Sequence, residues 1–567
     1  MATPSVTIAS GSTWQEVAAD RQQYRDETIA AIEPAVPAIP SDMPLNVSRL
    51  PRQLLTSEET KITEMLVEDL APALAEKRLS ATTVVKAFLR RAGLAQRLTN
   101  CLTELLPERA LARATYLDEY LATHEQPIGP LHGVPISVKE HIGMKDLDLN
   151  AGFVSWVGRV GDQDALVLQL LWKAGCVFFA RTTQPQSLMH LETSSNLYGV
   201  TVNPFNTTLS SGGSSGGEGA LVGLRGSILG IGTDIGGSIR SPAANNGLYG
   251  FKPTSYRLPL SGFSATMAGQ EQIVAVTGPL STSLEGIKLF MSTIIAGKPW
   301  LFEPSTLPFK WEDKRGLWQQ GEKKLKIAVL WDDGIVAPHP PVTRALREVV
   351  DKLKAKGNVE VISWNPYGHD EAWKIIANLY FSDGAAQECA AIEASGEPYR
   401  PLTNFIIQEN PYLQSHTITS LWEATARRES YRAAYAAHWN STATLTGPSG
   451  PEDMVDMILC PVGPSAAPKI DTARYWGYTA QWNLLDYPSV VFPVSKVGEE
   501  DDVEKSYTPR NADDEYNWSL WQKYGAKGYW DAPVSLQLVG RRYEDEKTIR
   551  ALEVIKDETG LPFVSYV

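Results

Sequence analysis

The chain has 567 residues, of which 43% are hydrophobic and 21% are charged, a balance typical of a folded globular protein and not of a disordered one. Its 65 acidic and 52 basic residues give a formal net charge of −13, and no dense run of Lys or Arg offsets it, so a nucleic-acid partner is not expected. The 4 cysteines are far apart in the sequence, which argues against a disulfide scaffold and against a cysteine metal knuckle.

The location of the protein is predicted from two further features. The N-terminal residues lack the basic stretch and apolar core of a secretory signal. No apolar run reaches the roughly 18 residues that a spanning helix needs. We therefore expect a cytoplasmic protein without a membrane span.

The first part of the chain is predicted to be helical. Residues 1–55 are polar, rich in Pro and Ala, and predict an N-terminal extension ahead of a main domain over residues 56–567. Thr56 and Glu59 have the spacing of a capping box, and apolar residues at helical spacing over 62–74 predict one helix after them. Two more helices are expected, one capped by Ser80 and one over residues 107–120, with their apolar faces in the core.

After Pro127 the pattern changes to short apolar runs that alternate with glycine-rich turns and helical stretches. This order is typical of an α/β fold. Strands are predicted at residues 134–138, 176–180, 228–231, 326–331, 490–494 and 534–539. Residues 300–325 indicate a surface connection, and residues 496–530 indicate a polar excursion before the last strand.

Residues 210–253 are unusually dense in glycine, which implies left-handed turns or close backbone approach. A flexible linker is one interpretation, but apolar segments are embedded in the stretch. A phosphate-binding loop is another, but neither a Walker A sequence nor GxGxxG occurs. Residues 212–216 satisfy the GxSxG of a nucleophile elbow, which would need a downstream acid and a histidine. The histidines available for that hypothesis, none with a distinguishing context, are His339, His369, His416 and His438.

The second glycine-rich turn favours a different nucleophile, Ser238. Ser241 and Pro242 are predicted to cap and begin a helix, which puts Ser238 just before the helix N-terminus. The backbone amides of residues 235–237 then point inward, as an oxyanion hole requires. A serine hydroxyl still needs a neighbouring base before it can attack.

Three segments of the chain resemble the hallmark blocks of the amidase-signature hydrolases. They are residues 133–140, 212–217 and 232–240, and the spacing of 24 residues from Ser214 to Ser238 also fits. Supporting blocks lie at residues 250–254, 483–488 and 533–540. The resemblance covers about residues 56–560 and is closest to fungal acetamidases and general amidases.

The resemblance implies a single α/β catalytic domain, with a mixed, twisted central sheet and helices on both faces. It implies that Ser238 attacks the amide carbonyl and carries the acyl group, and that Ser214, preceded by a cis peptide bond, relays the proton. Lys139 is implied as the base. A lysine with its usual pKa of about 10.4 would be protonated, so burial has to lower the pKa of Lys139.

Other residues of the matching blocks are given supporting roles. The oxyanion and substrate site is predicted to consist of Ile235, Gly236, Gly237 and Leu188. Ser215 and Thr233 are expected to form supporting hydrogen bonds, and Asp234 and Arg240 to form a buried ion pair or network. His132, His141 and His190 are assigned no role. No metal ion and no cofactor are expected.

The function implied by the resemblance is hydrolysis of a carboxylic amide, such as acetamide or a small aryl amide, by a free-standing enzyme. The alternatives are a subunit of an amidotransferase assembly and a fatty-amide or ester hydrolase of the same family. The GxSxG hydrolase and a binding protein without activity are more remote. The expected partner is a small-molecule amide, and a homodimer is left open.

Overall fold

The computed structural model describes residues 11–314, 316–318, 323–443, 445–447, 450–501 and 507–564. Parts of three predicted segments, 1–55, 300–325 and 496–530, therefore lie outside the described residues. The two-part division at residues 55 and 56 stays a prediction.

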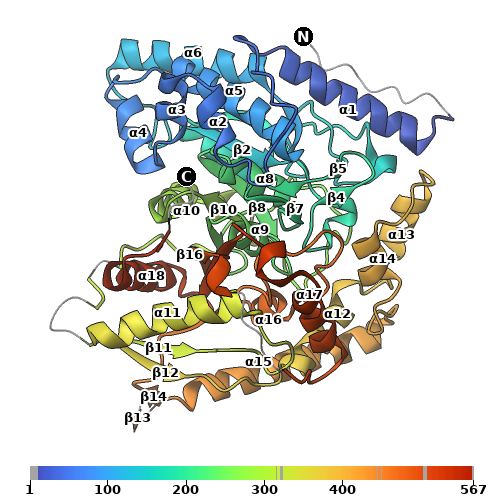
Figure 1. The fold of residues 1–567 in the computed structure, drawn as a ribbon, viewed down its shortest axis with the longest axis vertical. Coiled ribbons are helices and arrows are strands. Elements are labelled where there is room, and N and C mark those ends of the chain that lie inside the picture. The colour runs from blue at the N-terminus through green and yellow to red at the C-terminus, as the bar shows by residue number, and fades with distance from the viewer. Residues whose placement is uncertain are drawn as a thin grey trace.

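Within the described ranges, a mixed sheet of 11 strands runs through the whole molecule (Figure 1). β2 pairs in parallel with β3 and β8, and β11 pairs in parallel with β12 and β15, whereas the other neighbours are antiparallel. The strands, in spatial order, are β1 Leu102–Leu105, β3 Val177–Thr182, β2 Pro135–Lys139, β8 Leu229–Asp234, β10 Val276–Ser281, β9 Tyr249–Lys252, β16 Ser489–Lys496, β17 Pro533–Val539, β15 Met457–Pro461, β11 Leu325–Val329 and β12 Val359–Ser363. The predicted strands all belong to this sheet.

Helices connect and cover the strands, and short two-stranded ladders lie outside the main sheet. The helices are α1 Trp14–Ala30, α2 Leu50–Leu54, α3 Ser57–Thr63, α4 Val67–Ala75, α5 Ala81–Thr99, α6 Pro107–His124, α7 Leu166–Lys173, α8 Gly216–Gly223, α9 Arg240–Asn245, α10 Leu284–Ala296, α11 Pro340–Lys356, α12 His369–Tyr380, α13 Ala386–Glu393, α14 Pro401–Ile407, α15 Ile418–Asn440, α16 Gly477–Leu484, α17 Ala512–Gly528 and α18 Asp545–Thr559. The ladders pair β4 Ser194–Ser195 with β5 Gly199–Val200, β6 Val202–Asn203 with β7 Asn206–Ser210, and β13 Leu445–Gly447 with β14 Gly450–Glu452.

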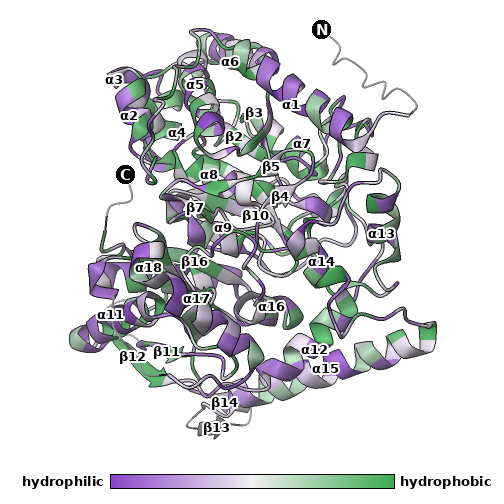
Figure 2. Cartoon of the chain, turned by 45° about the vertical axis from the view of Figure 1, so that its right-hand side comes forward, coloured by the Kyte–Doolittle hydropathy of each residue, from purple (hydrophilic) through white to green (hydrophobic). Residues whose placement is uncertain are grey.

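Alternate residues of the strands enter two separate apolar cores, because successive side chains of a strand point to opposite faces. On β11, Ile327 and Val329 pack into the core that contains α5, α10, α11 and α18, whereas Ala328 enters the core formed with α12, α15 and α16. Helices therefore cover both faces of the sheet, which confirms the predicted α/β class. Figure 2 shows the outer α1 mostly hydrophilic.

The first predicted helix is divided into two in the structure. Thr56 accepts a hydrogen bond from the Glu59 amide in the predicted capping box, but α3 ends at Thr63 and α4 begins at Val67. The carboxylate of Glu64, between the two helices, binds Arg52 and Arg91. These partners lie outside the periodic pattern, so the spacing of apolar residues carried no signal of the break. The Ser80 cap is confirmed, and the third helix extends to His124.

The N-terminal segment packs on the edge of the sheet. α1 lies along β1, where the Leu105 amide donates a hydrogen bond to Thr28 Oγ1 at 3.0 Å. Gln22 of the same helix binds the carbonyl of Leu197 at 2.7 Å. In the described ranges, no helix is both long enough and apolar enough to cross a bilayer.

Candidate active site

Lys139 is the last residue of β2 and its side chain is completely buried. β2 and β8 are parallel neighbours, with Val138 opposite Ile231. The carboxyl ends of parallel neighbours lie at the same edge of a sheet, which is where α/β proteins place their ligands. Lys139 and the loop that follows β8 therefore meet at one edge.

The amine of Lys139 has two hydrogen-bond partners. Its Nζ donates to Ser214 Oγ at 2.6 Å and to Thr233 Oγ1 at 3.0 Å. Burial lowers the pKa of Lys139 from 10.5 to about 7, although the negative charges of Asp234 and Glu218 oppose the change. The predicted lowering of this pKa is confirmed, and near neutral pH the amine is present in both protonation states.

Ser214 lies in the tight turn between β7 and α8, after the cis peptide bond Gly213–Ser214 that the resemblance implied. A Cβ at Gly213 would approach the backbone nitrogen of Glu192 to 2.4 Å, so only glycine fits there. In the described part of the chain no histidine forms a hydrogen bond with Ser214. The nucleophile-elbow hypothesis therefore lacks the base that it needs.

Ser238 lies in the loop between β8 and α9 and is 6% exposed. The Ser215 amide donates a hydrogen bond to the Ser238 carbonyl at 3.1 Å, which joins the Ser214 turn to this loop. Ser215 Oγ also pairs with the backbone of Thr233, accepting from its amide at 3.3 Å. Ser215 therefore forms hydrogen bonds with Ser238 in the loop and with Thr233 in β8, which agrees with the supporting hydrogen bonds expected of it.

The carboxylate of Asp234 organises the loop around Ser238. It accepts hydrogen bonds from the amides of Gly237 and Ile239, at 2.9 and 3.1 Å, and from Asn483 Nδ2 at 2.9 Å. Arg240 donates to it through Nε at 3.0 Å and through a terminal nitrogen at 2.9 Å. Burial alone would raise the pKa of Asp234, but Arg240 and Asn483 lower it to about 2. Asp234 and Arg240 therefore form the expected buried ion pair.

The predicted cap of the following helix is wrong. α9 begins at Arg240, so Ser241 and Pro242 are its second and third residues. The amides at its start are satisfied by Asp234, five residues before Ile239, and a local cap is not needed. Pro242 is tolerated because the first amides of a helix have no partner within the helix.

The amides near Ser238 differ in their availability. The Gly237 amide donates to Asp234 and so holds the loop. In the part of the chain that the structure describes, the amides of Ile235 and Gly236 have no hydrogen-bond acceptor, while the carbonyls of these two residues accept from Tyr380 at 3.0 Å and Thr479 at 2.6 Å. The carbonyl contacts fix the peptide planes. We therefore assign Gly237 a structural contact in place of the predicted oxyanion role.

Thr233 connects Lys139 to a histidine that the sequence analysis left without a role. His141 Nδ1 lies 2.9 Å from the carbonyl of Ser264, and its Nε2 lies 3.0 Å from Thr233 Oγ1. A carbonyl only accepts, so Nδ1 carries the proton. Burial, and then the charge of Lys139, lowers the pKa of His141 well below its usual range, so the ring is neutral and Nε2 accepts from Thr233. Thr233 Oγ1 is left to accept from Lys139.

Glu218 is a second residue that sequence reasoning missed, although it follows the block around Ser214 directly. It is completely buried, and its carboxyl accepts hydrogen bonds from Ser137 at 2.5 Å and Thr182 at 2.8 Å. Burial raises its pKa to about 8. In its ionised form Glu218 raises the pKa of Lys139, and the charge of Lys139 lowers that of Glu218, so each group affects the protonation of the other.

A cavity of ≈ 330 Å³ lies between the candidate residues and a surface loop that contributes residues between 260 and 275 to its wall. Leu188, Ile235, Ser214, Thr233 and Ser238 all contribute to its wall, so the structure brings these predicted residues together. The predicted amides of Gly236 and Gly237 are not part of this wall. Most of the remaining lining is apolar: Met189, Leu260, Phe263, Met267, Ile273 and Val274.

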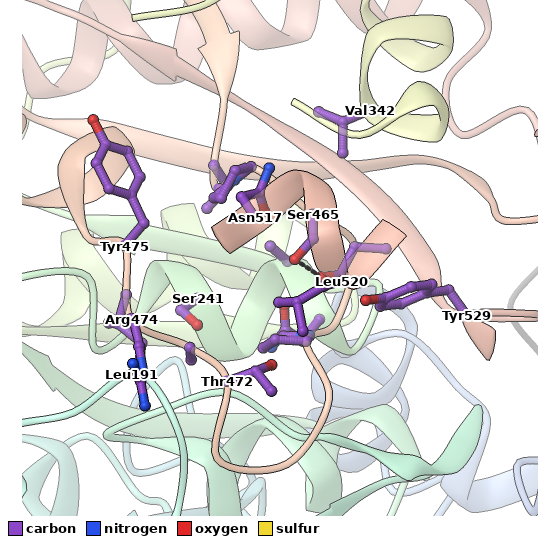
Figure 3. A pocket seen from close by; sticks show the side chains of 18 of the residues that line it. Leu191, Ser241, Val342, Ser465, Thr472, Arg474, Tyr475, Asn517, Leu520 and Tyr529 are labelled. Atoms are coloured by element: carbon purple, nitrogen blue, oxygen red, sulfur yellow. Dashed lines mark hydrogen bonds between the residues drawn. The ribbon is translucent and has the colours of Figure 1, made fainter. Parts of the chain in front are cut away.

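A second cavity of ≈ 70 Å³ lies beside α9 (Figure 3). Ser241 of α9 lines it, together with Tyr475, Asn517 and Leu520 from the neighbouring segments. It holds neither Ser214 nor Ser238, so it is not the candidate site. Nowhere in the described ranges are three or more His, Cys, Asp or Glu side chains grouped to hold a metal ion.

Comparison with known proteins gives consistent matches. The family model described as Amidase matches residues 83–549. A Schizosaccharomyces pombe protein that carries an amidase name is 44% identical, over 96% of this chain and 98% of its own length. An acetamidase of Emericella nidulans is 38% identical over 96% and 98% of the two chains. The solved structure of a fatty acid amide hydrolase is 34% identical, covers 97% of this chain and 96% of its own, and superimposes with a TM-score of 0.86.

Proposed function

Because this chain belongs to the amidase family and is a hydrolase that acts on amides, we propose that it cleaves a small aliphatic or aryl amide through an acyl-enzyme on Ser238. The observation that carries the proposal is the contact of 2.6 Å between the buried Lys139 and Ser214, in a cavity that Ser238 also lines. The two-part division of the chain and its cytoplasmic location remain predictions beside it.

The first half of the reaction transfers the acyl group. Neutral Lys139 takes the hydroxyl proton of Ser214, which takes the proton of Ser238 as the Ser238 oxygen bonds to the amide carbon. The protonated amine donates to both Ser214 and Thr233. In the neutral amine one hydrogen can stay on Thr233, whose own hydrogen is donated to His141, while the lone pair accepts from Ser214. The same chain, run in reverse, protonates the departing nitrogen as its bond to carbon breaks.

The negative charge that develops on the carbonyl oxygen needs backbone donors. We assign this role to the amide of Ile235, which lines the cavity, whereas the oxyanion role of Gly236, which does not line it, stays a prediction. Tyr380 and Thr479 bind the carbonyls of Ile235 and Gly236 and hold this segment in place. A Cβ at Gly236 would approach the Tyr380 hydroxyl to 2.7 Å, so a residue with a side chain at this position would displace Tyr380.

The second half releases the acid. A water molecule gives a proton to Lys139 through Ser214 as its oxygen bonds to the acyl carbon. The ester bond to Ser238 then breaks, the proton returns from Lys139 through Ser214 to the Ser238 oxygen, and the acid that is released loses its remaining proton to solvent as the carboxylate. The chemistry uses side chains and backbone amides of this chain alone, so we propose that neither a metal ion nor a cofactor takes part.

The size of the cavity bears on the substrate. The acetamidase relative supports acetamide or another small amide. A volume of ≈ 330 Å³ equals about ten water molecules at ~30 Å³ each, so the cavity also has room for a larger acyl group. The likeness to a fatty acid amide hydrolase favours longer acyl amides as the second candidate.

The test is acyl capture by mass spectrometry. The full chain is incubated with a panel of amides from acetamide to aryl and long-chain amides, quenched in acid and digested. We expect the acyl mass on Ser238 and not in Ser238→Ala, while Ser241→Ala, a control in the next turn that faces the second cavity, keeps it. Capture on Ser214 or Ser215, or loss of turnover with a chelator, would contradict the proposal.

A further inference from the structure

Glu388 of α13 is a buried carboxyl with few partners. The residue is completely buried, and among the described residues only the Thr266 side chain and the residue's own amide lower its pKa by hydrogen bonding, neither of them in full hydrogen-bond geometry. Glu397 nearby is equally hidden but accepts from Val154 at 2.8 Å and Gln186 at 2.8 Å. Buried polar groups without partners are rare and costly, so Glu388 calls for a ligand in a way that Glu397 does not.

α13 packs beside two segments that line the cavity holding Ser238, one at Leu188 and one at Met267. Ser155 donates a hydrogen bond to the Ala391 carbonyl at 2.5 Å, and the Met267 amide donates to Gln387 at 2.9 Å. Residues three and four positions after Glu388 share its face of the helix, and these two, Ala391 and Ile392, belong to the apolar cluster against which Leu188 packs. Leu188 and Met267 both line the cavity. Glu388 is therefore placed between the two segments.

Thr266 lies between Glu388 and the cavity. It lines the cavity, and its side chain acts on the Glu388 carboxyl. Burial raises the pKa of Glu388, Thr266 lowers it, and the nearby charge of Asp383 raises it again, while no basic group among the described residues contributes. No cation among the described residues therefore balances Glu388, and Thr266, which lines the cavity, keeps its hydroxyl oxygen as a hydrogen-bond acceptor for a ligand.

A second unpartnered group lies on the same cavity. Ser187 is 1% exposed, lines the cavity, and its Oγ has no hydrogen bond within the described residues. Its φ of +67° is rare for a residue with a side chain and is typical of positions held for a function. Because most of the other lining is apolar, these few polar groups can fix the orientation of a ligand.

We propose that Ser187 and Thr266, with Glu388 behind Thr266, bind a hydrogen-bond donor carried by the substrate at a distance from its scissile amide. Preferred substrates are then amides that bear a hydroxyl or an ammonium group, and plain alkyl amides of equal length are poorer. This inference rests on the proposed function. It names Glu388 as a specificity-determining residue outside the reacting groups.

The experiment compares amides that differ only in the terminal group. The kcat/KM of the full chain is measured for butanamide, pentanamide and hexanamide and for their terminal hydroxy and amino derivatives. At the length that matches the site, we expect the substituted amide to be preferred by about 10- to 100-fold, the value of a hydrogen bond to a charged group. Glu388→Leu should remove this preference. Glu393→Gln, which removes the same charge from an exposed position of α13, should change neither.

The outcomes separate the inference from the function on which it rests. Glu388→Gln distinguishes the two donors, because it removes the charge that attracts an ammonium, whereas Ser187 and Thr266 still accept from a hydroxyl. Alkyl amides that are turned over as well as their substituted partners at every length would overturn the inference and leave the amidase function intact. That comparison uses the unmodified chain, so it holds even if the Glu388 variants do not fold. Failure to hydrolyse any amide would overturn the function itself.

Discussion

Lys139 makes the pH dependence of the reaction predictable. With its ordinary pKa of 10.5, about 1 lysine in 3,000 would be neutral at pH 7, whereas with a pKa of about 7 roughly half of the molecules have a neutral amine. In the proposed mechanism only the neutral amine can take the proton of Ser214. Burial therefore raises the active fraction at neutral pH by about three orders of magnitude.

The sign of the effect follows from the direction of the shift. As pH falls through about 7, Lys139 gains a proton and kcat/KM should fall, by about tenfold per pH unit below pH 6. From about 90% neutral at pH 8, the fraction drops to about 1% at pH 5. Initial rates with the substrate far below KM, measured from pH 5 to pH 9 by ammonia or arylamine release, would record this limb.

Two variants test the assignment. Lys139→Ala should lose the acid limb together with most of the activity, and Lys139→Arg should not recover it, because a guanidinium does not deprotonate in this range. Ser214→Ala should be milder than Lys139→Ala, since water can partly replace a hydroxyl that relays a proton. An unchanged acid limb in the residual activity of Lys139→Ala would refute the reasoning. His141 cannot supply that limb, because its pKa lies well below the usual range.

Three other substitutions test the site. Ser238→Ala should reduce turnover by several orders of magnitude, and a phosphonate label found elsewhere by peptide mapping would argue against this nucleophile. Gly217→Ala places a Cβ 2.5 Å from a backbone nitrogen and should lower the free energy of unfolding by about 1–3 kcal/mol, whereas Gly316→Ala, in open space, should change it by less than about 0.5 kcal/mol in the same urea titration. Asp234→Asn leaves the buried Arg240 unpaired and should cost about 3–5 kcal/mol, so an unchanged melting curve would contradict the role of this ion pair.

The parts of the structure that the sequence predicted are those with a local signal. The Thr56 and Ser80 caps depend on residues three positions away, and both are present. The cap at Ser241 was wrong because the start of α9 is satisfied by a side chain from the end of β8. No local pattern encodes that contact.

The same distinction applies to the site. The glycine-rich blocks located Ser214 and Ser238, because the close approach of backbone at Gly213 excludes other residues. The link from Ser264 through His141 to Thr233 spans more than 90 residues and depends on how the surface loop packs. The hydrogen-bond partners of Glu218, which belongs to α8, likewise come from β2 and β3. Such contacts follow from the tertiary fold and have no spacing to recognise.

The carbonyl of Ser264 has a consequence for the timing of the reaction. It belongs to the loop that forms the outer wall of the cavity, and it fixes which nitrogen of His141 carries the hydrogen. If the loop lifts, the imidazole is free to exchange its tautomer, the Thr233 hydroxyl can turn around, and the lone pair of Lys139 is no longer directed at Ser214. In such an open form the base would be misaligned, and the contact between Ser264 and His141 would have to form again before the reaction. The position of the loop and the readiness of the base are in this way linked.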